Sequence, residues 1–320
     1  MTALSNWFDL RRLFKIPVAL FGLFWLINAG FQFSGWVWQP DHNGETNLLH
    51  AFGAAMAHAP AWLRPYFVWI TDVMRGVGPH QVALGMVTIA LLLGLSLIFH
   101  VGTLAACVLG AIYSLLCWVS LCALGYPYGG GQTDPSVFPA YIIVFVFVLS
   151  VLPAISPDLQ AARPREALWT TGRLLFGLLW GFDAVLKWQP YFLTHFLDQL
   201  IPASQGQPAW IAAYIGLVIT IVKAVGPLMV AVVVAMIETL FSISLLTGRW
   251  MRMFVPAGFF YSLAVWTTAE GWGGPYSSAG TGVRGNVLGN ILIYALIYLF
   301  LLMPLLQRTP EWQPPGARFR

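Results

Sequence analysis

Charged residues are scarce in this chain of 320 residues, where Asp, Glu, Lys and Arg together make up 9%. Soluble domains carry roughly a quarter of their residues as charged types. Hydrophobic residues instead account for 58% of the chain, and the mean hydropathy is +0.74. The composition excludes a cytosolic enzyme and predicts an integral membrane protein whose main partner is the lipid bilayer.

Cysteine is also rare, and all three cysteines (Cys107, Cys117 and Cys122) lie inside one apolar run without C-x-x-C spacing. This pattern argues against a disulfide scaffold, a zinc site and a dithiol redox centre. The six histidines show no spacing typical of metal ligands, so no metal site is predicted. The sequence also lacks a motif for covalent haem, flavin or an iron–sulfur cluster.

Apolar runs of the length needed to cross a bilayer predict eight transmembrane helices. They lie near residues 17–38, 80–98, 103–125, 137–153, 172–190, 227–246, 252–268 and 287–306. In this predicted topology, 11 of the 16 Lys and Arg residues lie on the same side of the membrane as the two termini. The positive-inside rule then predicts both termini in the cytoplasm of a multi-pass protein of a bacterial inner membrane. Because the basic residues sit at the ends of spans, the net charge of +4 does not indicate a nucleic-acid partner.

Two further apolar stretches, 61–77 and 209–225, are interrupted by charged residues. We expect both to form helices that lie at the outer interface of the membrane. If the second stretch spanned the bilayer instead, the number of spans would be odd and the C-terminus would lie outside.

An internal repeat relates the two halves of the chain. The run PAWLRPYFVWITDVMRGVGP from Pro60 returns as PAWIAAYIGLVITIVKAVGP from Pro208, a shift of 148 residues that also carries Trp118 onto Trp266. Further upstream the shift is 155, and FGLFWLINAGFQF from Phe21 matches FGLLWGFDAVLKW from Phe176. Since four spans are an even number, both copies start on the same side of the membrane and are predicted to be parallel repeats.

The predicted fold is therefore an all-α membrane protein with eight transmembrane helices in two parallel-repeated four-helix bundles, plus outer interfacial helices. Residues 1–155 form the first, diverged repeat and residues 172–306 the second. A polar cytoplasmic linker is predicted over 156–171, and residues 307–320 form a cytoplasmic tail.

Three charged residues in deep positions belong to the second repeat alone. Asp183 and Lys187 lie at i and i+4 on one helix face. Glu238 stands where the first repeat has Ala90. A charge near the bilayer centre costs about 2.5–3.5 kcal/mol on insertion scales, so such residues face the interior of a bundle and pair. The pattern is typical of a proton relay or a protonatable ligand site, but Asp183 and Lys187 could equally form an ion pair that only locks the bundle.

The loop after the third span of each repeat is rich in glycine and aromatic residues. It reads GYPYGGGQTDPSVFPAY from Gly125 and EGWGGPYSSAGTGVRGN from Glu270. Asp134 is retained in the first copy only, whereas Glu270 occurs in the second copy only. Such loops approach a ligand closely, and two interpretations remain open: a wet connector with interfacial aromatics, or a mouth that covers a site between the spans.

The second repeat resembles the DoxX and DoxD membrane proteins. The resemblance is carried by R-L-L-F-G-L-L-W-G-F-D-A-V-L-K from Arg173, by the acidic residue in the second span, and by G-W-G-G-P-Y-x-x-x-G-T from Gly271, and it covers about residues 170–305. It implies Asp183, Lys187 and Glu238 as catalytic residues. It also implies a substrate-binding set formed by Arg173, Trp180, Asp134, Trp272, Tyr276 and Thr281. Gly282 stands where the motif leads us to expect an acidic residue, whereas the first copy keeps a Thr-Asp pair at Asp134, so one composite site could draw on both halves.

DoxD is the small subunit of an archaeal thiosulfate:quinone oxidoreductase, so the resemblance implies a membrane redox component. Such a component would couple oxidation of thiosulfate or another small reductant to the quinone pool, with quinone as the cofactor. A partner redox subunit or a homo-oligomer would complete the electron path. Two other classes stay open: a transporter for a small anion or a proton-coupled solute, and a non-catalytic scaffold subunit of a redox complex.

Overall fold

The computed structural model describes residues 10–38, 47–125, 133–155, 165–273 and 288–306. Within these ranges the chain is helical and contains no strand. The first half contains α1 (Leu10–Gln32), the π-helical turn η2 (Phe33–Trp38), α2 (Asn47–His58), α3 (Arg64–Val77), α4 (Pro79–Phe99), α5 (Thr103–Cys122), η3 (Ala123–Gly125) and α6 (Phe138–Ile155). The second half contains α7 (Glu166–Lys187), α8 (Pro190–Thr194), α9 (Leu197–Leu200), η4 (Pro202–Ser204), α10 (Ala209–Val225), α11 (Pro227–Thr247), α12 (Met251–Thr268) and α13 (Ile291–Leu306).

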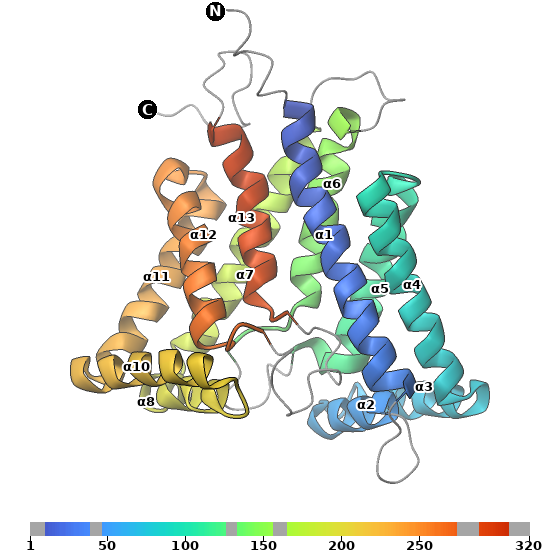
Figure 1. Cartoon of the computed structure of the whole chain (residues 1–320), viewed down its shortest axis with the longest axis horizontal. Helices are drawn as coiled ribbons and strands as arrows, with labels where there is room; N and C mark the ends of the chain where they lie inside the picture. Colours follow the sequence, from blue (N-terminus) through green and yellow to red (C-terminus); the bar gives the residue numbers. More distant parts are fainter. Residues whose placement is uncertain (1–9, 39–46, 126–132, 156–164, 274–287, 307–320) are drawn as a thin grey trace, which may run out of the picture.

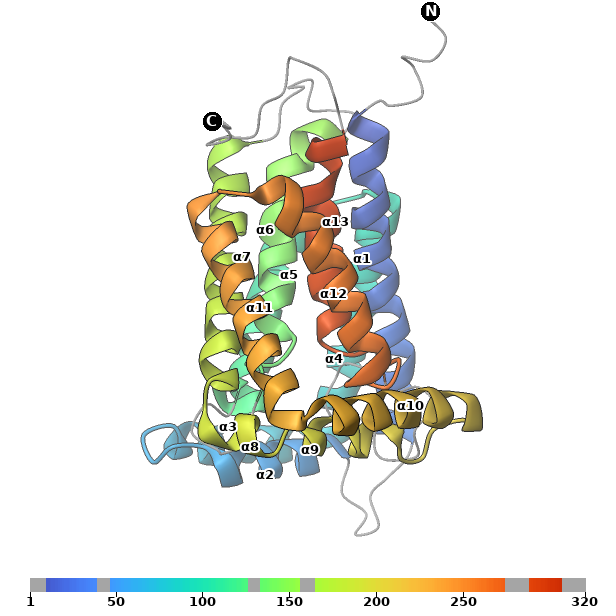
Figure 2. The same ribbon diagram turned by 90° about the vertical axis from the view of Figure 1, so that its left-hand side faces the viewer.

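Each of the eight predicted spans corresponds to a long helix, and these helices run alongside one another (Figures 1 and 2). Five of them (α1, α4, α5, α6 and α11) are long and apolar enough to cross a membrane on length and composition alone. Helix α7 does not meet these criteria and contains four charged residues, and α13 is only 16 residues long. The structure thus supports a helical membrane protein, and the total of eight spans stays a prediction.

Helix α7 begins at Glu166, within the stretch that the sequence analysis assigned to the linker. The helix therefore begins six residues before residue 172, where the second repeat was predicted to start. The acidic side chain of Glu166 lies in the first turn, where it complements the helix dipole. The predicted tail, 307–320, lies outside the described residues.

The two stretches predicted as interfacial helices lie across one end of the bundle. Helices α3 and α10 run nearly perpendicular to the long helices, together with α2 and α8 (Figures 1 and 2). Gly78 and Gly226 each make the sharp turn into the following long helix, with φ of 102° and 107°, a backbone conformation that glycine adopts without strain. The start of α1 and the end of α13 lie together at the opposite end (Figure 1).

The two halves pack around one hydrophobic core, and each half contains an equivalent indole hydrogen bond. They meet where α6 packs against α7 and where α1 and α6 pack against α13, and the rings of Phe147 and Phe300 stack there at 5.7 Å. Trp118 donates its indole N–H to the carbonyl of Pro135, three residues before α6. Trp266 donates in the same way to Leu288, three residues before α13, and both distances are 2.8 Å.

Candidate functional site

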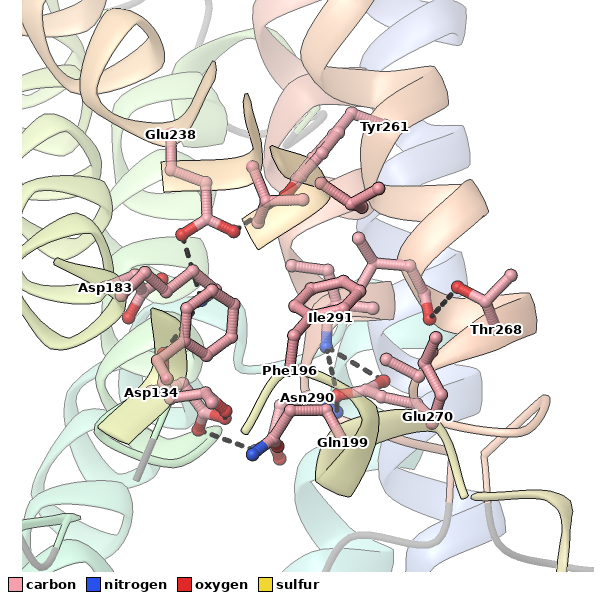
Figure 3. A pocket seen from close by; sticks show the side chains of 18 of the residues that line it. Asp134, Asp183, Phe196, Gln199, Glu238, Tyr261, Thr268, Glu270, Asn290 and Ile291 are labelled. Atoms are coloured by element: carbon pink, nitrogen blue, oxygen red, sulfur yellow. Dashed lines mark hydrogen bonds and ion pairs between the residues drawn. The ribbon is translucent and has the colours of Figure 1, made fainter. Parts of the chain in front are cut away.

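A cavity of about 370 Å³ lies within the second half, at the end of the bundle that carries the perpendicular helices. Its sides come from α7, α11, α12 and α13, and residues of α8, α9 and α10 cover it. The helical period explains the lining, because Val230, Val234 and Glu238 follow one another at intervals of four on a single face of α11. On α7, Asp183 and Lys187 face the same space. Figure 3 shows Asp183 and Glu238 close to each other on the wall of the cavity.

An ion pair crosses the cavity between α7 and α11. The ammonium group of Lys187 lies 2.9 Å from Oε2 of Glu238. The other carboxylate oxygen, Oε1, accepts a hydrogen bond of 2.8 Å from the hydroxyl group of Tyr261 on α12. The sequence analysis considered a pair between Lys187 and Asp183 on one helix. In the structure the ion pair of Lys187 is with Glu238, on another helix.

Three polar groups on the cavity wall make no hydrogen bond of full geometry among the described residues, although Asp183 and Tyr294 lie close enough to interact, as do Trp180 and Tyr298. These are Oδ1 of Asp183, the indole N–H of Trp180 and the hydroxyl group of Tyr294. All three side chains are at least 98% buried. Leaving a buried polar group unpaired costs about 1–3 kcal/mol, and more for a charged group. Their position on a cavity therefore indicates a place where a ligand or water completes the hydrogen bonding.

The first half contributes to this cavity through the segment before α6. Lys187 donates a hydrogen bond of 2.9 Å to the backbone carbonyl of Thr133. Next to it, Oδ1 of Asp134 accepts hydrogen bonds from the side-chain amide of Asn290 at 2.9 Å and from the backbone N–H of Ser136 at 2.8 Å. The cavity is thus composite, and Asp134 is held as part of its wall (Figure 3).

Glu270 is a fourth carboxyl group on the wall, and it lies in the connection after α12. Its Oε1 accepts hydrogen bonds from the backbone N–H groups of Asn290 at 2.8 Å and Ile291 at 3.1 Å, at the start of α13. Burial and the nearby negative charge of Asp134 raise the pKa of Glu270 from 4.5 to about 8, although these N–H groups oppose the shift. Glu270 therefore caps α13 and holds a proton at neutral pH.

Five of the nine residues selected from the sequence line the cavity: Asp134, Trp180, Asp183, Lys187 and Glu238. Tyr276 and Thr281 lie outside the described residues. The remaining two, Arg173 and Trp272, line no part of this cavity.

Arg173 lies near the opposite end of the bundle. Its guanidinium group donates to the backbone carbonyls of Leu245 and Leu246, at the end of α11. Those carbonyls have no partner within their own helix, so Arg173 caps the end of α11 in this structure. Trp272 packs its ring against Trp266 at 5.2 Å and Trp210 at 5.5 Å, beside the cavity and not in it.

Comparison of the chain with protein-family models, curated proteins and solved structures finds no match. The DoxX-like resemblance therefore rests on the sequence motifs alone. Among the described residues, no cluster of three or more His, Cys, Asp or Glu side chains is arranged to hold a metal ion.

The wall also contains residues that the sequence analysis did not select, namely Tyr261, Tyr294, Asn290 and Glu270, together with Phe192 and Phe196 of the covering segment. Two of them carried a signal in the sequence. Tyr261 matches Tyr113 in the repeat, and Glu270 occurs only in the second copy. Tyr294 gave no signal, because it is one aromatic residue in an otherwise apolar helix.

The corresponding region of the first half is neutral. Asn28 occupies the position that matches Asp183, and its amide donates a hydrogen bond of 2.7 Å to Tyr141. Gln32 replaces Lys187, and Ala90 replaces Glu238. The first half thus forms its helices without these charges, so helix packing alone does not require them in the second half.

Proposed function

We propose that the protein is a membrane redox component whose second half binds a quinone head group in the cavity beside Lys187. The observation that carries this proposal is the set of buried polar groups that face the cavity without a hydrogen bond of full geometry, formed by Asp183, Trp180 and Tyr294. A quinone carbonyl accepts hydrogen bonds of the kind that an ammonium, indole or phenol group donates. A quinol hydroxyl donates a hydrogen bond, which the carboxylate of Asp183 would accept.

Reduction of a quinone consumes two electrons and two protons. The electrons come from a reductant and enter the ring, and the protons bind the two carbonyl oxygens to give the quinol. Carboxyl groups on the cavity wall would supply these protons and take new ones from the outer side. Glu270 holds a proton at neutral pH and lies near the loops, which suits it to this exchange.

The charges of the wall disfavour a free anion as the ligand of this cavity. The described wall carries four carboxyl groups (Asp134, Asp183, Glu238 and Glu270) and one ammonium group, Lys187, which Glu238 already pairs. A dianion such as thiosulfate would meet net repulsion unless several carboxyl groups were protonated. We therefore propose that a reduced sulfur compound, or whichever small reductant is used, is oxidised outside this cavity, by a partner subunit that passes electrons to the quinone.

We further propose that the chain crosses a bacterial inner membrane eight times, as two parallel repeats of a DoxX-like unit, with both termini in the cytoplasm. The matched indole hydrogen bonds of Trp118 and Trp266 support the repeat. The common side for the start of α1 and the end of α13 supports an even number of spans (Figure 1). The excess of basic residues on that side supports its cytoplasmic placement.

A transport function receives less support from the geometry. The cavity occupies one end of the second half, and deeper in the same bundle Phe176, Phe241 and Tyr298 pack against one another with ring centroids 4.9–6.0 Å apart. These rings separate the cavity from the other end of the bundle. The described residues thus leave no path for a solute from the cavity to that end of the bundle.

Protein purified from its native membrane tests the proposed function. Organic extraction should release quinone from the wild-type protein, and a reductant with the native partner should reduce added quinone. Asp183→Asn removes the buried carboxylate charge at constant size and should abolish turnover, whereas Asn28→Ala, a change at the matching position of the first half, should not. Uptake of a solute into liposomes without quinone reduction would support a transporter, and a stable complex with neither activity would support a scaffold.

A further inference from the structure

The cavity has a polar side and an apolar side, contributed by different helices. The polar groups come mainly from α7, α13 and the segment at Thr133 and Asp134, which lie toward the first half. The facing wall carries Glu238, Tyr261 and Thr268 but is otherwise aliphatic, formed by Val218 and Val222 of α10, Val230 and Val234 of α11, and Val265 of α12. Figure 1 shows α10, α11 and α12 at the edge of the molecule, with α7 and α13 nearer its middle. The aliphatic wall therefore separates the cavity from the lipid side of the bundle.

Helices α11 and α12 form a seam in this wall, because each packs mainly on another partner. Helix α11 packs on α7, where Ser242 donates a hydrogen bond of 2.8 Å to the carbonyl of Gly177. Helix α12 packs on α13, where Gly258 lies against the ring of Tyr298. Deep in the bundle, the Tyr261–Glu238 hydrogen bond joins α11 to α12.

Nearer the end of the bundle, α10 covers the seam. There Tyr214 and Thr267 form a hydrogen bond of 3.1 Å between α10 and α12. Val222 of α10 belongs to a small apolar cluster with Phe192 and Phe196, distinct from the main core. The region between the hydrogen bond of Tyr261 and the layer of α10 is thus lined mainly by valines. The hydroxyl group of Thr268, which also lines it, already donates a hydrogen bond of 2.7 Å to the carbonyl of Ala264 in its own helix.

We infer that the ligand is an amphiphile that enters from the bilayer through the α11–α12 seam beneath α10 and leaves an alkyl tail there. This inference rests on the proposed function, since it assigns the head group to the polar side of the same cavity. An apolar tail loses no hydrogen bond in such a seam, whereas a water-soluble ligand would leave the valine wall without a role. The outer face of α11 agrees, because its exposed residues Met229, Val233 and Met236 are apolar and suit contact with acyl chains.

Photolabelling of the wild-type protein in nanodiscs tests the route. The probe is decylubiquinone with a diazirine at the end of its tail, and the competitor is the same benzoquinone head group without a tail. We expect labelling that the competitor suppresses, on peptides of α10, α11 and α12. Competition separates a specific site from partition of the tail into lipid, because the tail-less head group competes only for the head site.

Each other result overturns the inference in a recognisable way. Suppressible labelling on α1–α6, or confined to α7 and α13, would refute the seam and leave quinone binding intact. The absence of suppressible labelling anywhere would refute the proposed function, and the inference would fall with it.

A matched pair of variants adds a second measurement. Val234→Trp narrows the seam from the wall, whereas Val233→Trp adds the same ring at the neighbouring residue, which is 39% exposed on the outside. Relative to Val233→Trp, the Val234→Trp change should raise the Kd of decylubiquinone by about tenfold while the Kd of the tail-less head group changes by less than about threefold. Equal effects on both probes, or no effect on either, would contradict lateral entry.

Discussion

The ion pair between Lys187 and Glu238 allows a quantitative test of how the cavity is held together. At 2.9 Å and an effective dielectric constant of about 20, two unit charges attract by about 6 kcal/mol. Desolvation of both groups offsets much of this, but removing one partner alone leaves an uncompensated buried charge and typically costs about 3–5 kcal/mol. We therefore expect Lys187→Gln and Glu238→Ala each to destabilise the protein by about that amount.

The double variant should recover most of this loss. It gives the second half the residues that the first half has at the matching positions, Gln32 and Ala90, which are both buried there without the charges. Once neither charge is present, neither member of the pair is left as an unpaired ion, and the costs that still count are the lost attraction of Lys187 for Asp183, the added cavity volume and the lost Tyr261 hydrogen bond. We expect a coupling free energy of about 2–4 kcal/mol between the two sites.

Unfolding free energies measured by steric trapping in bicelles give this coupling directly, and melting temperatures of the same preparations provide a check. Asn28→Ala serves as a control for a buried polar change in the other half. If the two single changes simply added in the double variant, the pair would not be coupled. The ion pair would then not be a structural element of the cavity, which would refute the reasoning.

Three further predictions concern other parts of the fold. Glu270 has a pKa of about 8 in the folded protein and an ordinary value of 4.5, so between these pH values the folded state binds a proton that the unfolded state has lost. The free energy of unfolding should therefore fall as the pH rises from 4.5 to 8. In Glu270→Gln the melting temperature should depend less on pH over this range. Arg173→Met should lower stability by about 1–3 kcal/mol, because the end of α11 loses its cap, and should leave ligand binding unchanged in a titration. Trp118→Phe and Trp266→Phe each remove one indole hydrogen bond and should lower stability by a similar amount of about 1 kcal/mol, and a large difference in their melting temperatures would contradict the equivalence of the halves.

The helices could be predicted well from the sequence, because apolar length and the positions of charges are local properties. The spans at 80–98 and 227–246 match α4 (Pro79–Phe99) and α11 (Pro227–Thr247) within one residue at each end. The perpendicular placement of α10 was also predicted, from a single lysine in an apolar stretch. The boundary at Glu166 could not be predicted, since a polar run at the start of a helix looks like a linker until its partners are known.

The cavity could be predicted in part, because it depends on contacts between distant segments. Comparing the two repeats identified Asp183, Lys187 and Glu238, because only the second copy carries these charged residues. All three line the same cavity. It did not reveal that Lys187 pairs across helices with Glu238, because an i,i+4 neighbour is the only partner that the sequence displays. The contact of Arg173 with the end of α11 could not be predicted for a similar reason, since nothing in the sequence places those carbonyls beside it.

Equilibrium binding of decylubiquinone to the purified protein in nanodiscs tests most directly whether the cavity of the second half is the ligand site. We predict one site per chain in the wild type and in Asn28→Ala. In the Lys187→Gln/Glu238→Ala double variant, which is expected to stay folded, we predict that affinity falls by at least about tenfold. Unchanged binding in the double variant, or a loss in Asn28→Ala equal to that in the double variant, would contradict the assignment of the site to this cavity.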